Sequence, residues 1–144
     1  MKNICMLIFI ASTLSAGWCS NYRIISHKFS KGEKVKMKIP NNFVFEGLEG
    51  DNEKEYRYWY PDSSVIYITT FENTLNYEAI RQQNTYYKRF DAIYTNDTLT
   101  LEGRKPNNTF WKDKLLATGV TIGYSAVPKR RLGEFEKALS STKR

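Results

Sequence analysis

Two neighbouring segments between residues 55 and 71 constrain the fold of this chain more than any other feature. The first alternates two sets of side chains, with Tyr56, Tyr58 and Tyr60 on one face and Arg57 and Trp59 on the other. This period of two predicts a strand. Residues 61–64 predict a turn, and residues 65–71 are almost all β-branched or aromatic, which predicts a return strand. The return strand is expected to be central in a sheet, apolar on both faces or covered by a helix.

Further strands are predicted on both sides of this hairpin. Lysines alternate with apolar residues over 34–39, so a half-buried strand with a lysine face in water is expected there. The other predicted strands cover 43–45, 92–95, 98–102, 110–117 and 120–127. The strands at 92–95 and 98–102 are expected to form a hairpin with a two-residue turn. Gly123, inside the last strand, indicates a bulge or a close approach of two backbones.

Two helices are predicted. Residues 75–89 combine good helix formers with apolar and aromatic residues at helical spacing. The second helix follows Pro128 and carries one apolar stripe of Leu132, Phe135, Ala138 and Leu139. Because hairpin turns join most of the strands, the order predicts an α+β fold. We expect an antiparallel sheet of about 5–7 strands with the two helices packed on one face.

The first residues have the grammar of a secretion signal. Lys2 supplies the positive charge, residues 4–14 are apolar, and Ser15, Ala16 and Gly17 are small. The apolar stretch is well short of the ~20 residues that a membrane-spanning helix needs. Residues 1–17 are therefore predicted to be a signal peptide, and the mature protein to be exported, either periplasmic or associated with the cell envelope, or secreted. No transmembrane helix is expected after leader cleavage.

Cys19 raises an alternative to simple cleavage after Gly17. Small residues directly before a cysteine are typical of a bacterial lipoprotein, but Trp18 intervenes here. Lipidation of Cys19 and a free N-terminus near Trp18 both stay open. Cys5 lies in the leader, so the mature chain has one thiol and no internal disulfide. Residues 18–32 are predicted to be a flexible lead-in and residues 33–144 a single domain.

The pattern of elements is similar to that of a known family. The aromatic strand pair, the helix at 75–89, the strands carrying Trp111 and Gly123, and the closing helix with Phe135 resemble the layering of PsbP/Mog1-like domains. The resemblance covers residues 33–142. Most members of that group are binding or assembly factors, so the resemblance implies an α-β-α arrangement, a binding role and no catalytic residues to carry over.

Catalytic chemistry is not predicted. The single histidine, His27, precedes the first predicted strand and is expected at the surface, outside the core. One histidine and one thiol are too few for a zinc or iron site of the usual kind. No spacing selects a catalytic pair among the carboxylates Glu55, Asp62, Glu72, Asp91, Glu102 and Asp113. The protein is therefore predicted to be no enzyme and to have no cofactor.

Two clusters are candidate partner-binding sites. The first contains Arg57, Trp59 and Tyr67, which would stack on a partner, although the rings also suit a core under a helix. Since a strand shows alternate residues on opposite faces, either the Tyr58 set or the Trp59 set is expected to be partly exposed. The second cluster is basic and lies in or beside the closing helix, with Lys129, Arg130 and Arg131 as its binding candidates and Lys137, Lys143 and Arg144 as its other members.

With 21 basic and 15 acidic residues, the mature chain carries a net charge of +6, which favours an anionic partner. An exported protein seldom meets nucleic acid, so an anionic envelope polymer or a protein is expected instead. These features favour a non-enzymatic binding or accessory domain of the cell envelope. Two alternatives stay open, a periplasmic immunity protein that inhibits a toxin and a small hydrolase. A polymer binder is distinguished by salt sensitivity, an inhibitor by one compact complementary patch, and a hydrolase by two carboxylates in a deep pocket.

Overall fold

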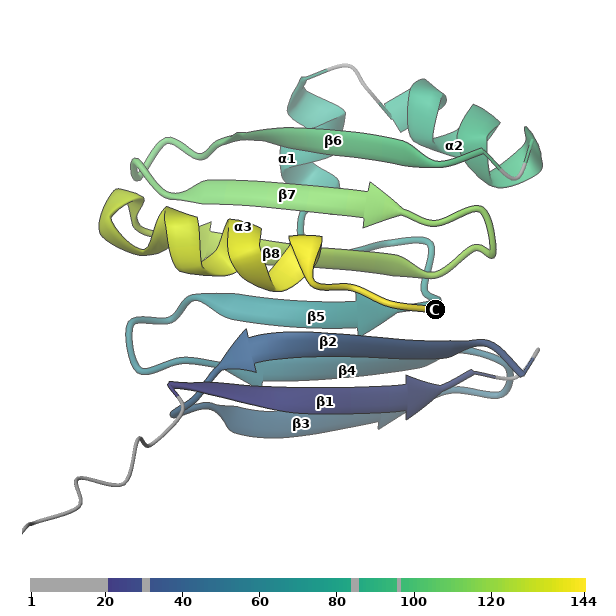
Figure 1. Cartoon of the computed structure of the whole chain (residues 1–144). Helices are drawn as coiled ribbons and strands as arrows, with labels where there is room; N and C mark the ends of the chain where they lie inside the picture. Colours follow the sequence, from purple (N-terminus) through teal and green to yellow (C-terminus); the bar gives the residue numbers. More distant parts are fainter. Residues whose placement is uncertain (1–20, 30–31, 84–85, 96) are drawn as a thin grey trace, which may run out of the picture.

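The computed structural model describes residues 21–29, 32–83, 86–95 and 97–144 (Figure 1). The predicted signal peptide, residues 1–17, and Cys19 lie outside the described residues. Strands β1 to β5 are Tyr22–Lys28, Lys34–Pro40, Val44–Glu49, Lys54–Trp59 and Val65–Thr69. The helices α1 and α2 are Tyr77–Gln82 and Tyr86–Thr95. The last elements are β6 (Leu99–Arg104), β7 (Phe110–Leu115), β8 (Thr121–Val127), the 3-10 turn η1 (Lys129–Arg131) and α3 (Leu132–Ser140).

The predicted α+β fold is confirmed. Six strands form one antiparallel sheet in the order β3-β4-β5-β8-β7-β6, and β1 and β2 form a separate two-stranded sheet. The hairpin predicted at residues 55–71 is β4 and β5, with Trp59 opposite Val65. All five residues of β5 are buried, as expected for a central strand.

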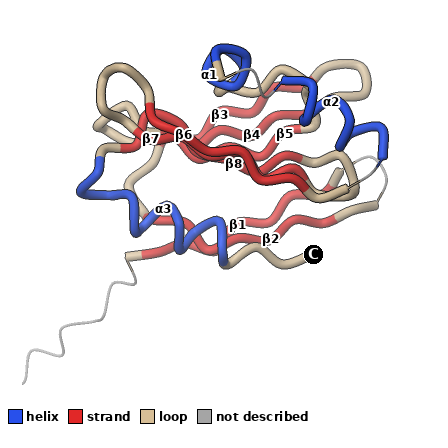
Figure 2. Tube along the Cα trace, turned by 90° about the horizontal axis from the view of Figure 1, so that it is seen from above, coloured by secondary structure: helices blue, strands red, loops and turns tan. Residues whose placement is uncertain are grey.

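Helices cover both faces of the six-stranded sheet, so the expectation that they share one face is wrong. Figure 2 shows α1 and α2 on one side and α3 beside the β1–β2 hairpin on the other. We call these the opposite face and the hairpin face of the sheet. The reason is visible in β8, where six of seven residues are buried. A strand that is apolar on both sides needs cover on both sides.

The prediction of a flexible lead-in over residues 18–32 is wrong for Tyr22–Lys28, which form the strand β1. Tyr22–Lys28 pairs with β2 along its whole length, from Tyr22 opposite Pro40 to Lys28 opposite Lys34. Ile25 and Phe29 are buried. The strand was missed because Ile24 points to solvent, where it is 62% exposed, and this interrupts the alternation that marks a half-buried strand.

The predicted hairpin of residues 92–95 and 98–102 is also wrong. Residues 92–95 belong to α2, which ends at Thr95, and β6 pairs with β7 instead, with Leu99 opposite Leu115. The helix predicted at 75–89 is divided between α1 and α2. Ile80 of α1 and Ala92 of α2 are buried, which explains why helical packing overrides the β propensity of 92–95.

The main core lies between the hairpin face and the layer that covers it. Its buried residues include Val35, Met37 and Ile39 of β2, which confirms the predicted alternation of that strand. The stripe predicted on the closing helix is also confirmed, because Phe135, Ala138 and Leu139 are buried in α3. Pro128 precedes the turn η1 rather than the helix itself. Within the described ranges, none of the helices combines the length and the apolar character needed to cross a membrane.

Candidate functional site

Arg57 and Trp59 lie on the opposite face of β4, away from the main core. Tyr58 is buried on the hairpin face, and the Arg57 and Trp59 side chains are partly exposed, so the predicted division of the two sets is confirmed. The Arg57 Nε donates to Glu55 Oε1, and the Trp59 Nε1 donates to Glu46 Oε2 over 2.9 Å. The Arg57 guanidinium also lies 3.3 Å from Glu46. These side chains are therefore engaged with carboxylates of their own sheet.

Tyr67 does not join them at the surface. Its side chain is fully buried on the opposite face of β5, so its assignment to an exposed partner-binding site is wrong. The hydroxyl donates to the Asp113 carboxylate of β7, and the Asn76 amide donates to the same hydroxyl over 2.8 Å. Thr74 donates to the second Asp113 oxygen over 2.6 Å. Tyr67 thus belongs to a buried polar network under α1.

Of the three cations at η1, two are exposed and the third is paired with carboxylates. Lys129 and Arg130 are exposed, but Arg131 donates to Asp62 over 3.1 Å and to Glu134 over 3.2 Å. The Arg131 guanidinium also lies over the ring of Tyr60, 4.8 Å from its centroid. Because Tyr60 packs in the main core with Phe135, Arg131 lies on the hairpin face, whereas Trp59 is on the opposite face. The structure therefore does not combine the two predicted clusters into one site.

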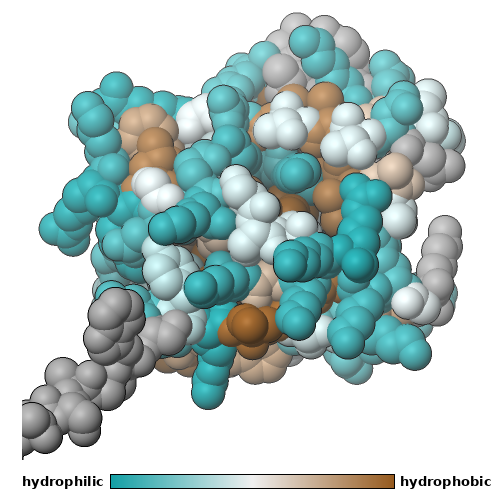
Figure 3. Space-filling model, viewed as in Figure 1, coloured by the Kyte–Doolittle hydropathy of each residue, from teal (hydrophilic) through white to brown (hydrophobic). Residues whose placement is uncertain are grey.

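A larger basic surface joins the predicted lysine face of β2 to part of the basic cluster predicted around the closing helix. The outward positions of the β1–β2 hairpin carry Lys28 opposite Lys34, Ser26 opposite Lys36, and Ile24 opposite Lys38. The C-terminal segment adds two more exposed cations. We define the lysine surface as Lys28, Lys34, Lys36, Lys38, Lys137 and Lys143, all of which are exposed. Figure 3 shows hydrophilic side chains projecting over most of this face.

A ring contact and a backbone bridge at the edge of the hairpin place residues of the lysine surface close to one another. The ring of Tyr22 lies 5.6 Å from Lys38 Nζ and 5.9 Å from Lys137 Nζ. Lys36 and Lys143 form a backbone bridge, with N···O distances of 2.9 and 2.8 Å. The lysine alternation in 34–39 was the sequence signal for half of this surface. Lys137 and Lys143 belong to the basic cluster predicted around the closing helix, and only Lys28 depends on the unpredicted pairing of β1 with β2.

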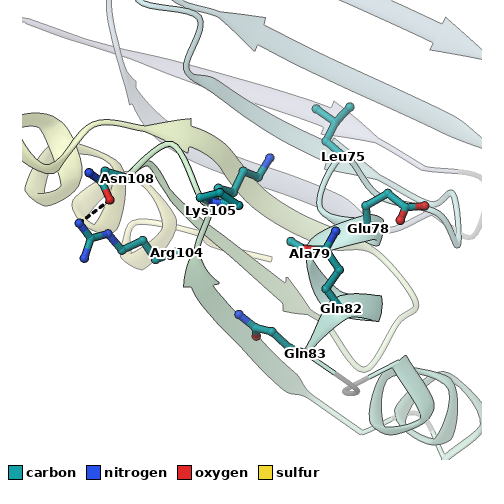
Figure 4. Close-up of a pocket in the computed structure, with 9 residues that line it drawn as sticks. Leu75, Glu78, Ala79, Gln82, Gln83, Arg104, Lys105 and Asn108 are labelled. Atoms are coloured by element: carbon teal, nitrogen blue, oxygen red, sulfur yellow. Dashed lines mark hydrogen bonds between the residues drawn. The ribbon is translucent and has the colours of Figure 1, made fainter.

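A groove lies between α1 and the loop that joins β6 to β7 (Figure 4). Its volume is about 580 Å³. One wall carries Arg104, Lys105 and Asn108, and the other carries Glu78, Gln82 and Gln83. The Arg104 guanidinium donates to Asn108 Oδ1 over 2.7 Å. The groove therefore presents cations on one side and amides with a carboxylate on the other.

Lys105 extends from the wall of this groove to a buried hydroxyl of β8. Its Nζ donates to the Ser125 hydroxyl over 2.6 Å. Burial lowers the pKa of the Lys105 ammonium, and the negative charge of Asp113 acts in the opposite direction. The lowered pKa indicates that desolvation of this ammonium is only partly compensated by groups of the protein.

His27 is not the surface residue that the sequence predicts. Its ring is half-buried in β1 and stacks on Tyr56, with 3.8 Å between the ring centroids. The Tyr58 hydroxyl and His27 Nε2 share a hydrogen bond. Burial lowers the pKa of His27, which favours the neutral ring. The correction follows from β1, because His27 faces the sheet once its strand is paired.

The carboxylates considered for catalysis have different surroundings. Glu55 pairs with Arg57, Asp62 with Arg131, and Glu102 with Lys112. Glu72 and Asp91 are exposed, and Asp113 is in the buried network. In the part of the chain that the structure describes, no group of three or more His, Cys, Asp or Glu side chains is arranged to hold a metal ion.

Comparisons with models of protein families, with curated proteins and with solved structures found no match to this chain. The resemblance to PsbP/Mog1-like domains stays a prediction.

Proposed function

We propose that this protein is an exported, non-enzymatic domain of the cell envelope that binds a linear anionic polysaccharide through the lysine surface. The observation that carries the proposal is the register of the β1–β2 hairpin. It places Lys28, Lys34, Lys36 and Lys38 on one outward face. In the two strands as described, the positions on this face include no acidic residue. A polyanion would therefore meet one sign of charge along the hairpin.

The geometry of the strands suits an extended polymer. Alternate residues of a strand are about 6.6 Å apart, so the lysines of β2 form a straight row with a regular repeat. The ion pairs among the described residues use other cations, such as Lys54, Lys112 and Arg131, and leave this row available for a ligand. Tyr22 places an aromatic ring between two of these lysines.

An anionic membrane is the competing ligand for such a face. Insertion into a lipid interface depends on buried apolar area as well as charge. Among the outward positions of the hairpin that the structure describes, Ile24 is the exposed aliphatic side chain. One such residue gives little area for insertion, which favours a hydrated polymer over lipid.

The test is the affinity of the protein for heparin, used as a model sulfated polysaccharide, measured over a range of salt concentrations. We expect binding that weakens as salt rises. The triple substitution Lys34→Gln, Lys36→Gln, Lys38→Gln should weaken binding by roughly three- to a hundredfold, because each exposed charge pair contributes about 0.2–1 kcal/mol.

The matched control removes the same charge elsewhere, with Lys54→Gln, Lys88→Gln and Lys129→Gln. Equal losses in both triple variants would show that net charge alone drives binding and would overturn the lysine surface as the site. Vesicles containing phosphatidylglycerol form the second arm of the test. Binding to vesicles but not to heparin would overturn the polysaccharide assignment.

A further inference from the structure

The groove between α1 and the β6–β7 loop is separate from the lysine surface. Figure 2 shows α1 on the opposite face of the sheet from the β1–β2 hairpin. Figure 4 shows α1 on one side of the groove and the β6–β7 loop on the other. A ligand in this groove would therefore be a second ligand, bound independently of the polymer.

The charges of the groove limit the ligand class. Arg104 and Lys105 contribute two positive charges and Glu78 contributes one negative charge. The net charge of +1 matches a monoanion better than a phosphate, which carries more charge at neutral pH. Lys105 is half-buried beside Ser125 and has further N–H donors to offer. A ligand carboxylate would accept a charge-assisted hydrogen bond from this ammonium.

The rest of the lining fits a polyhydroxylated body. Gln82 and Gln83 each carry an amide that both donates and accepts hydrogen bonds, and the Glu78 carboxylate accepts them. Between these polar groups lie the apolar surfaces of Leu75, Ala79 and Pro106. Sugars present hydroxyl groups on their edges and C–H groups on their faces, so a mixed lining of this kind is complementary to them.

We propose that this groove binds a single sugar acid, with the ligand carboxylate on Lys105 and Arg104 and its hydroxyl groups on Glu78, Gln82 and Gln83. A half-buried cation that lines an open groove, opposite a wall of amides, is the juxtaposition that carries the proposal. The site does not depend on the lysine surface, and its ligand is a small molecule rather than a polymer.

The experiment is an NMR titration of the purified protein with sodium glucuronate, and with glucose and acetate as separate probes. We expect glucuronate to cause saturable shifts of amide signals in α1 and the β6–β7 loop. The affinity for glucose or acetate, measured from the same signals, should be at least about tenfold weaker. Equal responses to acetate and glucuronate would overturn the sugar assignment. Equal responses to glucose and glucuronate would overturn the role of the cations.

Two variants locate the site. Lys105→Met keeps an unbranched side chain of nearly the same length and removes its charge, and it should weaken glucuronate binding by about tenfold or more. Gln82→Ala changes an exposed side chain on the other wall and tests the site without disturbing the buried network. Lys129→Met, at η1, is the control and should leave glucuronate binding unchanged. If Lys129→Met weakens binding as much as Lys105→Met does, or if Gln82→Ala has no effect, the assignment is wrong.

Discussion

Tyr67 of β5 reaches across β8 to donate its hydroxyl hydrogen to the carboxylate of Asp113 in β7. Gly123 of β8 lies in register between them, opposite Tyr67 on one side and opposite Asp113 on the other. A Cβ atom at Gly123 would lie 2.7 Å from the Tyr67 hydroxyl oxygen and 2.6 Å from the backbone oxygen of Lys112. The absence of a side chain at one position therefore makes a buried hydrogen bond possible between strands that are not neighbours.

Gly123→Ala should destabilise the protein by roughly 2–4 kcal/mol, because the Tyr67 ring or the β7 backbone must move. Urea unfolding measures the change. Gly133→Ala is the matched control, since the added Cβ meets nothing within 4 Å on α3 and should stabilise the protein by about 0.5–1 kcal/mol. Similar stabilities of the two variants would contradict the close approach at Gly123.

Tyr67→Phe tests the hydrogen bond without changing the packing. The variant leaves Asp113 Oδ1 without its hydroxyl donor and the Asn76 amide with one acceptor fewer. We expect a loss of about 1–3 kcal/mol, since removing one partner of a buried polar group costs its desolvation. Tyr94→Phe removes the same hydroxyl from a ring that is 73% exposed and should change stability by less than about 0.5 kcal/mol.

The sequence was sufficient for the parts of the fold that depend on local pattern. The buried strand at 65–69, the alternation of 34–39 and the stripe on α3 are each visible within a few residues. Gly123 was predicted to allow a bulge or a close backbone approach, and the structure shows the close approach, with the backbone oxygen of Lys112 2.6 Å from where a Cβ would lie. What approaches it could not be predicted, because Tyr67 and Asp113 are 46 positions apart in the chain. No local pattern identifies a hydrogen bond of that separation.

The candidate sites were less predictable for a related reason. Aromatic residues in strands suit either a core or a binding surface, and only the tertiary fold decides between them. Tyr67 was assigned to the surface and is buried, whereas the place of Lys28 in the lysine surface needed the unpredicted strand β1. The groove lies between α1, which is within the helix predicted at 75–89, and the β6–β7 loop, and only the tertiary fold brings these two segments together.

Arg57→Ala should destabilise the fold, because Arg57 is a structural partner of a buried carboxylate. The side chain of Glu55 is 3% exposed, and Arg57 is its ion-pair partner. Loss of the arginine leaves a buried carboxylate uncompensated, so we expect a loss of about 2–4 kcal/mol. Adding Glu55→Gln should recover at least about half of the loss. If the single and double variants are equally unstable in urea, the ion pair is not the cause.

We expect the free energy of unfolding to decrease in mild acid because of His27. Burial lowers the pKa of the folded imidazole below its usual value of 6.5, and the rings packed on it, Phe45, Tyr56 and Tyr58, bring no formal negative charge. The unfolded chain then binds a proton more readily than the folded protein. His27 has no effect on stability well above pH ~7, and stability falls as the pH decreases through about 6.5.

The measurement is the urea midpoint at about pH 8 and about pH 5.5 for the wild type and for His27→Gln. We expect the midpoint of the wild type to fall more between the two conditions than that of the variant. An equal fall in both proteins would assign the acid sensitivity to other groups and would refute the role of His27.

The C-terminal residues pair with the edge of β2 that β1 does not cover. The backbone of Lys143 makes this contact, so its structural role can be tested separately from its charge. The Lys143 backbone donates to and accepts from Lys36, and the Ser141 hydroxyl accepts from the Lys38 amide over 2.8 Å. Lys143→Pro removes the donated bond, whereas Lys143→Gln keeps the backbone and removes only the charge. We expect Lys143→Pro to cost about 0.5–1.5 kcal/mol and to speed hydrogen exchange at the neighbouring Lys36 amide. Lys143→Gln should leave stability and exchange unchanged while it weakens heparin binding slightly, because it removes one cation of the lysine surface. If Lys143→Gln speeds exchange as much as Lys143→Pro, the edge of β2 is held by the side chain and not by the backbone bridge.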